Sequence, residues 1–320
     1  MENVQETSQG TQISTNDAIN AFKNSAALVE RPHKLLRLTG KNVAGMLNAI
    51  LTNDVPKEPR RGVYAMLLNP KGRIQTDLRV LKSGEDIIIA TEPEGADAAK
   101  EILGRYAPFS RAKLEELPGW RMLGLYGPHA KEMLSGPELA EYETAEVRLG
   151  DAVVLVAGVA RPVSGYDLIS TPETLQAVRN HLSQATPADT ASYETVRIEA
   201  GVPRFGADIT PDNFPGETGV LEKVVSFQKG CYPGQETVAR MHYRGHPNKT
   251  LHRFSLEGTA ATPGTEVTQN EKAVGSITSV APLSVNGKTF ALGYLSRKAD
   301  LEAPMSAAGA KLSCLGPVRG

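Results

Sequence analysis

The spacing of apolar residues changes from a helical to a strand period within the first hundred residues. Between residues 42 and 51, apolar side chains return at every third or fourth position, which predicts a helix with one buried face. Runs with a period of two follow, separated by short segments rich in Gly, Pro and Asn. They predict an antiparallel meander, followed by a second helix. The predicted strands cover residues 63–68, 74–81 and 87–90, and the second helix covers residues 95–106.

A similar order of strands and helices returns more loosely in the middle of the chain. Thr171 and Pro172 have the residue types that favour a helix N-cap and first turn, and Gly201 favours the end of another helix. Two units of this kind predict an α+β body with helices laid on antiparallel sheets. Predicted strands cover residues 121–126, 152–157 and 166–170, and predicted helices cover residues 129–134, 172–183 and 192–200.

The last third of the chain has a different character. Residues 202–224 show no clear period, and an irregular segment of that length in a compact domain is typical of a functional loop. Short apolar runs punctuated by Gly, Pro and Asn-Gly then predict a small C-terminal β-barrel, with strands at residues 251–256, 266–268, 273–280, 289–294 and 311–314. We expect a disordered polar tail at residues 1–16, the α+β body at residues 17–247 and the barrel at residues 248–320.

Composition narrows the class of protein. The 320 residues contain 40% hydrophobic and 22% charged residues, as in a globular protein with more than one domain. The formal net charge of −1 argues against direct binding to nucleic acid. The chain has only two cysteines, which are far apart, and its polar N-terminal residues show no signal-peptide pattern. It also has no apolar run of about 18 residues. These features predict a cytoplasmic protein that does not cross a membrane.

Residues 229–240 concentrate reactive and charged side chains in one short segment. The glycines and the proline around Cys231 favour a tight turn, and we expect an extended run from Gln235 and Glu236 onward. If Lys229 and Arg240 fold close to Cys231, their positive charge favours the reactive thiolate. The alternative is a buried structural cysteine in an ordinary turn.

Residues 229–236 read Lys-Gly-Cys-Tyr-Pro-Gly-Gln-Glu, and an Ala-Arg pair that ends at Arg240 follows them. This segment resembles the signature of the YgfZ-type folate-binding proteins, which are relatives of the aminomethyltransferase T-protein. Residues 51–55, 67–78, 197–208 and 215–217 also resemble that family, so the likeness runs from about residue 36 to about residue 295. It implies a folate-binding α+β body with a C-terminal β-barrel. It also implies tetrahydrofolate as cofactor and iron–sulfur enzymes, including tRNA-modifying ones, as client partners.

Asp77 is a candidate catalytic carboxylate. It lies on a predicted strand among apolar neighbours, where a carboxylate must be paired or have a raised pKa. An acid, base or hydrogen-bond acceptor role and a simple loop-capping role both fit this position. The T-protein has two aspartates here, whereas this chain has Thr76 before Asp77, which argues against aminomethyl transfer.

The resemblance also implies a folate site. Tyr166 and Asp167 match an aromatic and acid pair that holds the pterin, and a carboxylate can accept both donors of a pterin edge. Strand alternation alone instead predicts a solvent-facing Asp167. Arg204 and Lys229 are candidate clamps for the glutamate carboxylates, and Tyr232 is a candidate stacking partner. We assign the rest of the signature, Gln235, Glu236 and Arg240, to the same site.

No metal site is expected. His242, His246 and Cys231 offer three ligands on paper, but Gly245 and Pro247 disfavour the helix that would put both imidazoles on one face.

The leading hypothesis is a folate-binding accessory protein that uses Cys231 in assembly or repair of iron–sulfur clusters. The first alternative is a tetrahydrofolate-dependent aminomethyl or one-carbon transferase. The second is a hydrolase or acyltransferase with Cys231 as nucleophile and His242 or His246 as base.

Overall fold

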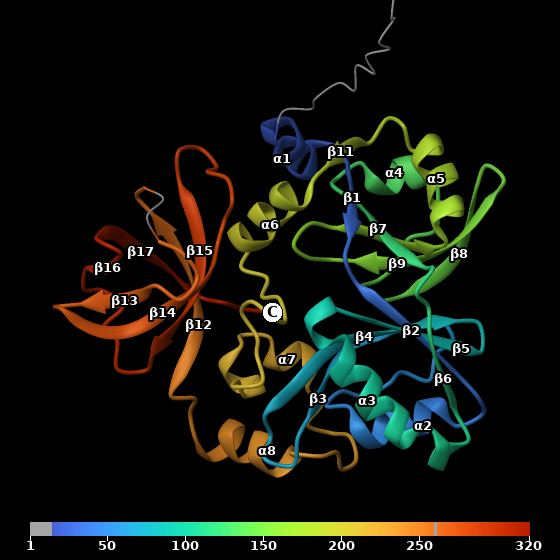
Figure 1. Cartoon of the computed structure of the whole chain (residues 1–320), viewed down its shortest axis with the longest axis horizontal. Coiled ribbons are helices and arrows are strands. Elements are labelled where there is room, and N and C mark those ends of the chain that lie inside the picture. Colours follow the sequence, from blue (N-terminus) through green and yellow to red (C-terminus); the bar gives the residue numbers. More distant parts are fainter. Residues whose placement is uncertain (1–14, 259–260) are drawn as a thin grey trace, which may run out of the picture.

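Two sheets packed face to face form the body of the protein, and a closed barrel stands beside them (Figure 1). The computed structural model describes residues 15–258 and 261–320. The predicted α+β class with a C-terminal barrel is confirmed. None of the described helices combines the length and the apolar character needed to cross a membrane.

The first sheet has six strands in the order β11-β1-β7-β10-β9-β8, and all neighbours are antiparallel except β1 and β11. Its outer face packs on helices α4 and α5 through a cluster that includes Leu123, Val156 and Leu175. Thr171 caps α5 as predicted, by accepting a hydrogen bond from the backbone N–H of Thr174. The bounds are β1 Ala27–Arg31, β7 Arg121–Tyr126, β8 Thr144–Leu149, β9 Ala152–Val159, β10 Gly165–Ser170, β11 Thr186–Ala188, α4 Ala130–Leu134 and α5 Pro172–His181.

The second sheet has five antiparallel strands in the order β3-β4-β5-β2-β6. Helices α2 and α3 cover its outer face, where Leu47, Leu78 and Leu103 are buried. The inner faces of the two sheets meet through a smaller apolar cluster that includes Leu81 and Ile169. The bounds are β2 Lys34–Thr39, β3 Val63–Leu68, β4 Ile74–Ser83, β5 Asp86–Thr91, β6 Lys113–Glu116, α2 Val43–Ile50 and α3 Ala96–Tyr106.

The barrel closes in the order β12-β15-β14-β13-β16-β17. Helices α1 and α6 lie between the first sheet and the barrel (Figure 1), and Phe22, Val196 and Val285 join the three parts in one cluster. The bounds are β12 Lys249–Leu256, β13 Glu266–Gln269, β14 Lys272–Val280, β15 Thr289–Ser296, β16 Met305–Ala307, β17 Ala310–Pro317, α1 Thr15–Asn24 and α6 Thr190–Glu199.

The predicted strands and the meander β3-β4-β5 are confirmed, but six strands, namely β1, β2, β6, β8, β11 and β16, were not predicted. Strands β1 and β2 lie inside their sheets. Strand β1 is buried on both faces over most of its length, so it lacks the alternation that marks a half-buried strand. Strand β2 alternates only from Leu36 to Thr39, which is too short a run to distinguish. Strands β11 and β16 have three residues each, too few to show a period.

Two predictions concern the chain between α6 and the barrel, and the structure agrees with one of them. Residues 202–224 are mostly irregular, as predicted, and end in the short helix α7, Leu221–Val224. The extended run predicted from Gln235 is wrong, because residues Gln235–Arg244 form helix α8. Gly234 has a φ of +82° and starts that helix directly after the turn, so the local sequence serves as a helix start and not as a strand start.

Helix α1 begins at Thr15, slightly before the predicted start of the body, and residues 1–14 of the predicted tail lie outside the described residues. We propose the boundary between body and barrel near residue 248, because α8 ends at Arg244 and the first barrel strand begins at Lys249.

Candidate functional site

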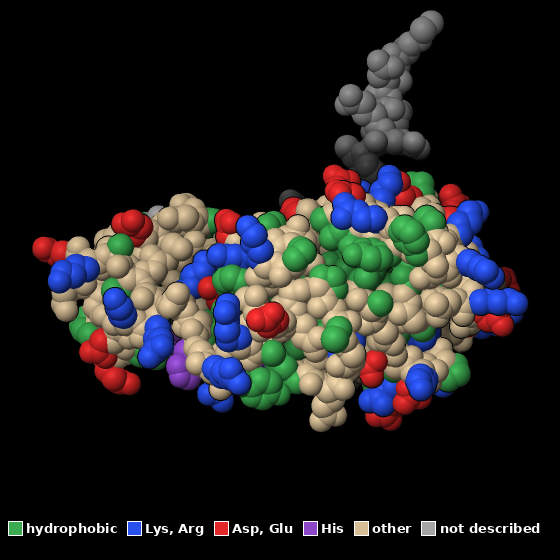
Figure 2. All heavy atoms as spheres, turned by 90° about the horizontal axis from the view of Figure 1, so that it is seen from below, with side chains coloured by type: hydrophobic (Ala, Val, Ile, Leu, Met, Phe, Trp, Pro, Cys, Tyr) green, Lys and Arg blue, Asp and Glu red, His purple; other side chains and the backbone are tan. Residues whose placement is uncertain are grey.

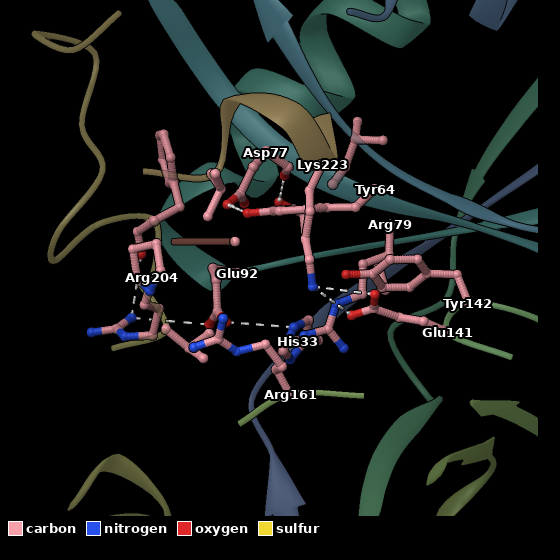
Figure 3. A pocket seen from close by; sticks show the side chains of 18 of the residues that line it. His33, Tyr64, Asp77, Arg79, Glu92, Glu141, Tyr142, Arg161, Arg204 and Lys223 are labelled. Carbon is pink, nitrogen blue, oxygen red and sulfur yellow. Dashed lines mark hydrogen bonds and ion pairs between the residues drawn. The ribbon is translucent and has the colours of Figure 1, made fainter. Parts of the chain in front are cut away.

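A cavity of about 670 Å³, part of it open to solvent, lies where the body, the irregular segment and the last residues of the chain meet (Figure 3). Strands β4 and β5 supply its inner wall. Among the described residues that line it, five are Arg or Lys and three are Asp or Glu, namely Arg79, Arg161, Arg204, Lys223, Arg319, Asp77, Glu92 and Glu141.

Asp77 on β4 lines the cavity, with 5% of its surface exposed. Its Oδ2 accepts a hydrogen bond from the Tyr64 hydroxyl at 2.5 Å. Burial raises the pKa of Asp77 from 3.8 to about 6, and the hydrogen bond from Tyr64 opposes that rise. Asp77 is therefore a carboxyl group that changes its charge close to neutral pH.

Asp167 on β10 lies behind the cavity wall. Its Oδ2 accepts a hydrogen bond from Arg79 at 2.6 Å, and its Oδ1 accepts one from the Tyr126 hydroxyl. Both carboxylate oxygens are therefore engaged within the protein. Tyr166 points to the opposite face of the same sheet, where it belongs to the cluster under α4 and α5.

Glu92 and His33 form a second buried polar group in the cavity wall. Glu92 follows β5, His33 lies between β1 and β2, and His33 Nε2 is 3.4 Å from Glu92 Oε1 (Figure 3). Burial lowers the pKa of His33 well below its ordinary value, and the charges of Arg79 and Arg31 act in the same direction. His33 is therefore neutral at physiological pH.

Cations surround the opening of the cavity. Lys223 Nζ is 3.3 Å from a carboxylate oxygen of Glu141, and Arg204 Nη1 is 2.9 Å from Glu94 Oε1 (Figure 3). The guanidinium of Arg161 donates to the backbone carbonyls of Ala200 and Arg319. The excess of cations favours an anionic ligand at this end.

Cys231 is exposed and is not among the described residues that line the cavity. Its turn packs on the turn between β3 and β4. A Cβ atom at Gly234 would lie 2.6 Å from the carbonyl oxygen of Asn69 and 2.8 Å from Cα of Gly72, so only glycine allows this close approach.

An apolar layer separates the Cys231 turn from the cavity. Tyr232 is buried in a cluster that contains Phe205 and Val220, two residues that also line the cavity. Lys229 Nζ donates to the carbonyls of Asn48 and Leu51 at the C-terminal end of α2, at 2.7 and 2.6 Å. Burial lowers the pKa of Lys229 to about 8. Its ammonium group therefore satisfies a helix end and does not reach the cavity.

The remaining residues of the signature lie on α8. Gln235 is partly buried in the first turn, whereas Glu236 and Arg240 are exposed, and none of these three lines the cavity in the described structure. Figure 2, which shows this side of the molecule, places Lys and Arg side chains together where the barrel meets the body.

The described residues contain no hydrogen bond between Cys231 and either His242 or His246 and no group of three metal-binding side chains. The ring of His242 instead stacks on Phe227 with centroids 4.1 Å apart. The hydrolase alternative therefore lacks an oriented base next to its nucleophile.

Of the residues predicted from sequence, the structure brings Asp77 and Arg204 to one cavity, with Asp167 joined to it through Arg79. Sequence reasoning missed Arg79, although a residue two positions after Asp77 on a strand shares its face. It also missed His33 and Glu92, for which the sequence gives no comparable signal.

The comparisons with known proteins agree with the resemblance seen in the signature. The model of the GCVT N-terminal domain family matches residues 6–229. A protein from Yersinia enterocolitica named tRNA-modifying protein YgfZ is 29% identical over 231 residues, which cover 71% of this chain and 69% of that protein. Its counterpart from Yersinia pestis strain Pestoides F is 28% identical over 232 residues, with the same coverage of both chains.

A solved structure supports the fold. The glycine cleavage system aminomethyltransferase T from Bartonella henselae superposes with a TM-score of 0.82 at 20% identity, over 97% of this chain and 89% of that chain. At this identity the likeness concerns the fold alone. Since the family model matches well over half of the sequence, the chain belongs to the GCVT N-terminal domain family.

Proposed function

We propose that this protein binds a reduced folate, tetrahydrofolate, in the cavity beside Asp77 and acts as an accessory protein in the assembly or repair of iron–sulfur clusters. The observation that carries the proposal is that the cavity offers both carboxylate acceptors and cations. Asp77 and Glu92 bring buried acceptors to the inner wall, which also carries Arg79, and Arg161, Lys223 and Arg319 bring further cations from other segments.

The presence of both kinds of group fits the two ends of a folate. A pterin ring presents N–H donors that carboxylates accept, and the glutamate end carries carboxylates that Arg and Lys bind. The buried polar atoms of this cavity that have no hydrogen-bond partner, such as Glu92 Oε2, also support a polar ligand. The names of the YgfZ relatives place them in tRNA modification, and we extend that setting to this chain as part of the proposal.

The first test is an anaerobic calorimetric titration of the purified protein with tetrahydrofolate. We expect saturable binding near one ligand per chain, because the cavity offers carboxylate acceptors to the ring and cations to the glutamate end of the same ligand. Glutamate alone at the same concentration serves as the control, since it lacks the ring. Absence of binding up to millimolar tetrahydrofolate would rule out the folate site.

We assign Cys231 to the contact with client proteins and not to the folate site, because the thiol is exposed and lies outside the cavity. We expect Cys231→Ser to reduce the activity of tRNA-modifying iron–sulfur enzymes severalfold in cells that depend on this protein. The affinity for tetrahydrofolate should stay unchanged. Cys314→Ser in the barrel is the matched control, and full client activity with Cys231→Ser would refute the role of the thiol.

A one-carbon transferase is the second candidate. The observation in its favour is the raised pKa of Asp77, at about 6, because a carboxyl group that titrates near neutral pH can exchange a proton with a folate nitrogen. Turnover of tetrahydrofolate with an aminomethyl donor, lost in Asp77→Asn, would support this candidate over a binding role.

A further inference from the structure

Polar atoms that are buried without a hydrogen-bond partner gather at one place in the described structure. Of the six such side-chain atoms, four belong to Arg31, His33, Glu92 and Arg204, and the last three of these residues line the cavity. An unpaired buried polar atom costs about 1–3 kcal/mol, so a cluster of them indicates a site that a ligand completes.

Glu92 carries the unpaired acceptor of this cluster. Its Oε1 lies 3.4 Å from His33 Nε2 and 3.9 Å from Arg31 Nη2. Its Oε2 lies 4.0 Å from Arg204 Nη1, which is too far for a hydrogen bond, and that same nitrogen is 2.9 Å from Glu94. Burial raises the pKa of Glu92, and the charges of Arg31, Arg79 and Arg204 oppose that rise. One of its carboxylate oxygens accepts no hydrogen bond.

His33 adds a second unpaired atom. Its Nε2 lies 3.4 Å from Glu92 Oε1, and its Nδ1 is buried without a hydrogen-bond partner. In the tautomer with the hydrogen on Nε2, which faces the carboxylate, Nδ1 is an acceptor. The cavity wall therefore holds the free acceptor of Glu92, the unpaired Nδ1 of His33 and the unpaired donor Nε of Arg204. The free carboxylate oxygen favours a group that presents N–H donors.

Asp167, the carboxylate that the resemblance implies for binding the pterin, is already hydrogen-bonded within the protein. Asp167 uses both oxygens on Arg79 and Tyr126, and releasing it would leave the buried Arg79 guanidinium without its partner. Glu92 needs no such rearrangement of a buried ion pair. The nearest cation to its free oxygen, Arg204, is 24% exposed and pairs with Glu94 at 2.9 Å.

We propose that Glu92, together with His33, is the acceptor that recognises a heterocycle with adjacent N–H donors, namely the ring nitrogen and 2-amino group of a pterin. This inference rests on the proposed folate binding and names the residues that read the ring. The acceptor for the ring is then Glu92 at the end of β5, on the same wall of the cavity as Asp77, and not Asp167 on β10.

The test compares the wild-type protein, Glu92→Gln and Glu138→Gln in the anaerobic titration with tetrahydrofolate. Glu138 is an exposed glutamate paired with Lys131, so its variant removes one charge away from the cavity. A lost hydrogen bond to a charged acceptor is expected to weaken binding by Glu92→Gln roughly 10- to 100-fold. Glu138→Gln should bind like the wild type.

The outcomes separate this inference from the proposed function. Wild-type binding with equal affinity in Glu92→Gln would overturn the inference and leave the folate site standing. No binding by the wild type would overturn both.

A second measurement needs only the wild-type protein, in case Glu92→Gln does not fold. A tetrahydrofolate analogue without the 2-amino group should bind at least about tenfold more weakly than tetrahydrofolate, because Glu92 loses a donor. Equal affinity for the two ligands would overturn the inference.

Discussion

Replacing Asp208 by alanine is expected to lower the free energy of unfolding by about 3–5 kcal/mol, because it breaks a buried ion pair and removes the shared acceptor of Arg197, Thr278 and Ser279, while Arg197 keeps its ion pair with Glu194. Asp208 is 1% exposed, and its Oδ2 accepts from Arg197 Nη1 at 2.7 Å. Its Oδ1 accepts from the hydroxyls of Thr278 at 2.6 Å and Ser279 at 2.7 Å on barrel strand β14. One carboxylate therefore joins α6, the irregular segment and the barrel.

Urea denaturation of Asp208→Ala and the wild type measures this effect. Asp212→Ala is the matched control, because Asp212 is an exposed aspartate of the same segment, and we expect a change within about 0.5 kcal/mol there. A loss below about 1 kcal/mol in Asp208→Ala would show that the barrel stays attached without this carboxylate.

Asp77→Asn is expected to stabilise the protein at neutral and alkaline pH by up to about 3 kcal/mol. Burial raises the pKa of Asp77 from 3.8 to about 6, so ionising this carboxyl costs free energy in the folded state. Asparagine keeps a similar shape and can accept the hydrogen bond from Tyr64, but it carries no charge.

The pH dependence has a defined sign. Between pH 3.8 and about 6, the folded protein holds a proton on Asp77 that the unfolded chain has released, so this group's contribution to stability falls as the pH rises. The difference in unfolding free energy between Asp77→Asn and the wild type should be small below about pH 4 and reach its full size above about pH 7.

Urea denaturation at several pH values checks this prediction, and the difference between the two proteins removes the titration of all other groups. A difference that does not change with pH would mean that Asp77 keeps an ordinary pKa. The same variant tests the transferase candidate, since a gain in stability with loss of turnover would mark Asp77 as a functional carboxyl kept at a cost in stability.

The buried interior strands show one limit of prediction from sequence. The turn residues before β4 predict that strand, whereas β1 is buried on both faces over most of its length and shows no alternation. Strand β2 alternates over only four residues, which is too short a run to identify it. The helix α8 was missed for a different reason. Its start depends on the left-handed conformation of Gly234, at a position where the close approach of Asn69 and Gly72 leaves no room for a Cβ atom.

The sequence by itself determined the class of the fold, the barrel, and the two segments that carry Asp77 and Cys231, because these depend on local periodicity and turn residues. Only the tertiary structure decided which polar groups meet. In the folded chain, Asp167 accepts a hydrogen bond from Arg79, an apolar layer separates the Cys231 turn from the cavity, and His33 lies next to Glu92. The physical reason is that strand alternation fixes the face on which a side chain lies, whereas its partners come from distant segments that only packing brings together.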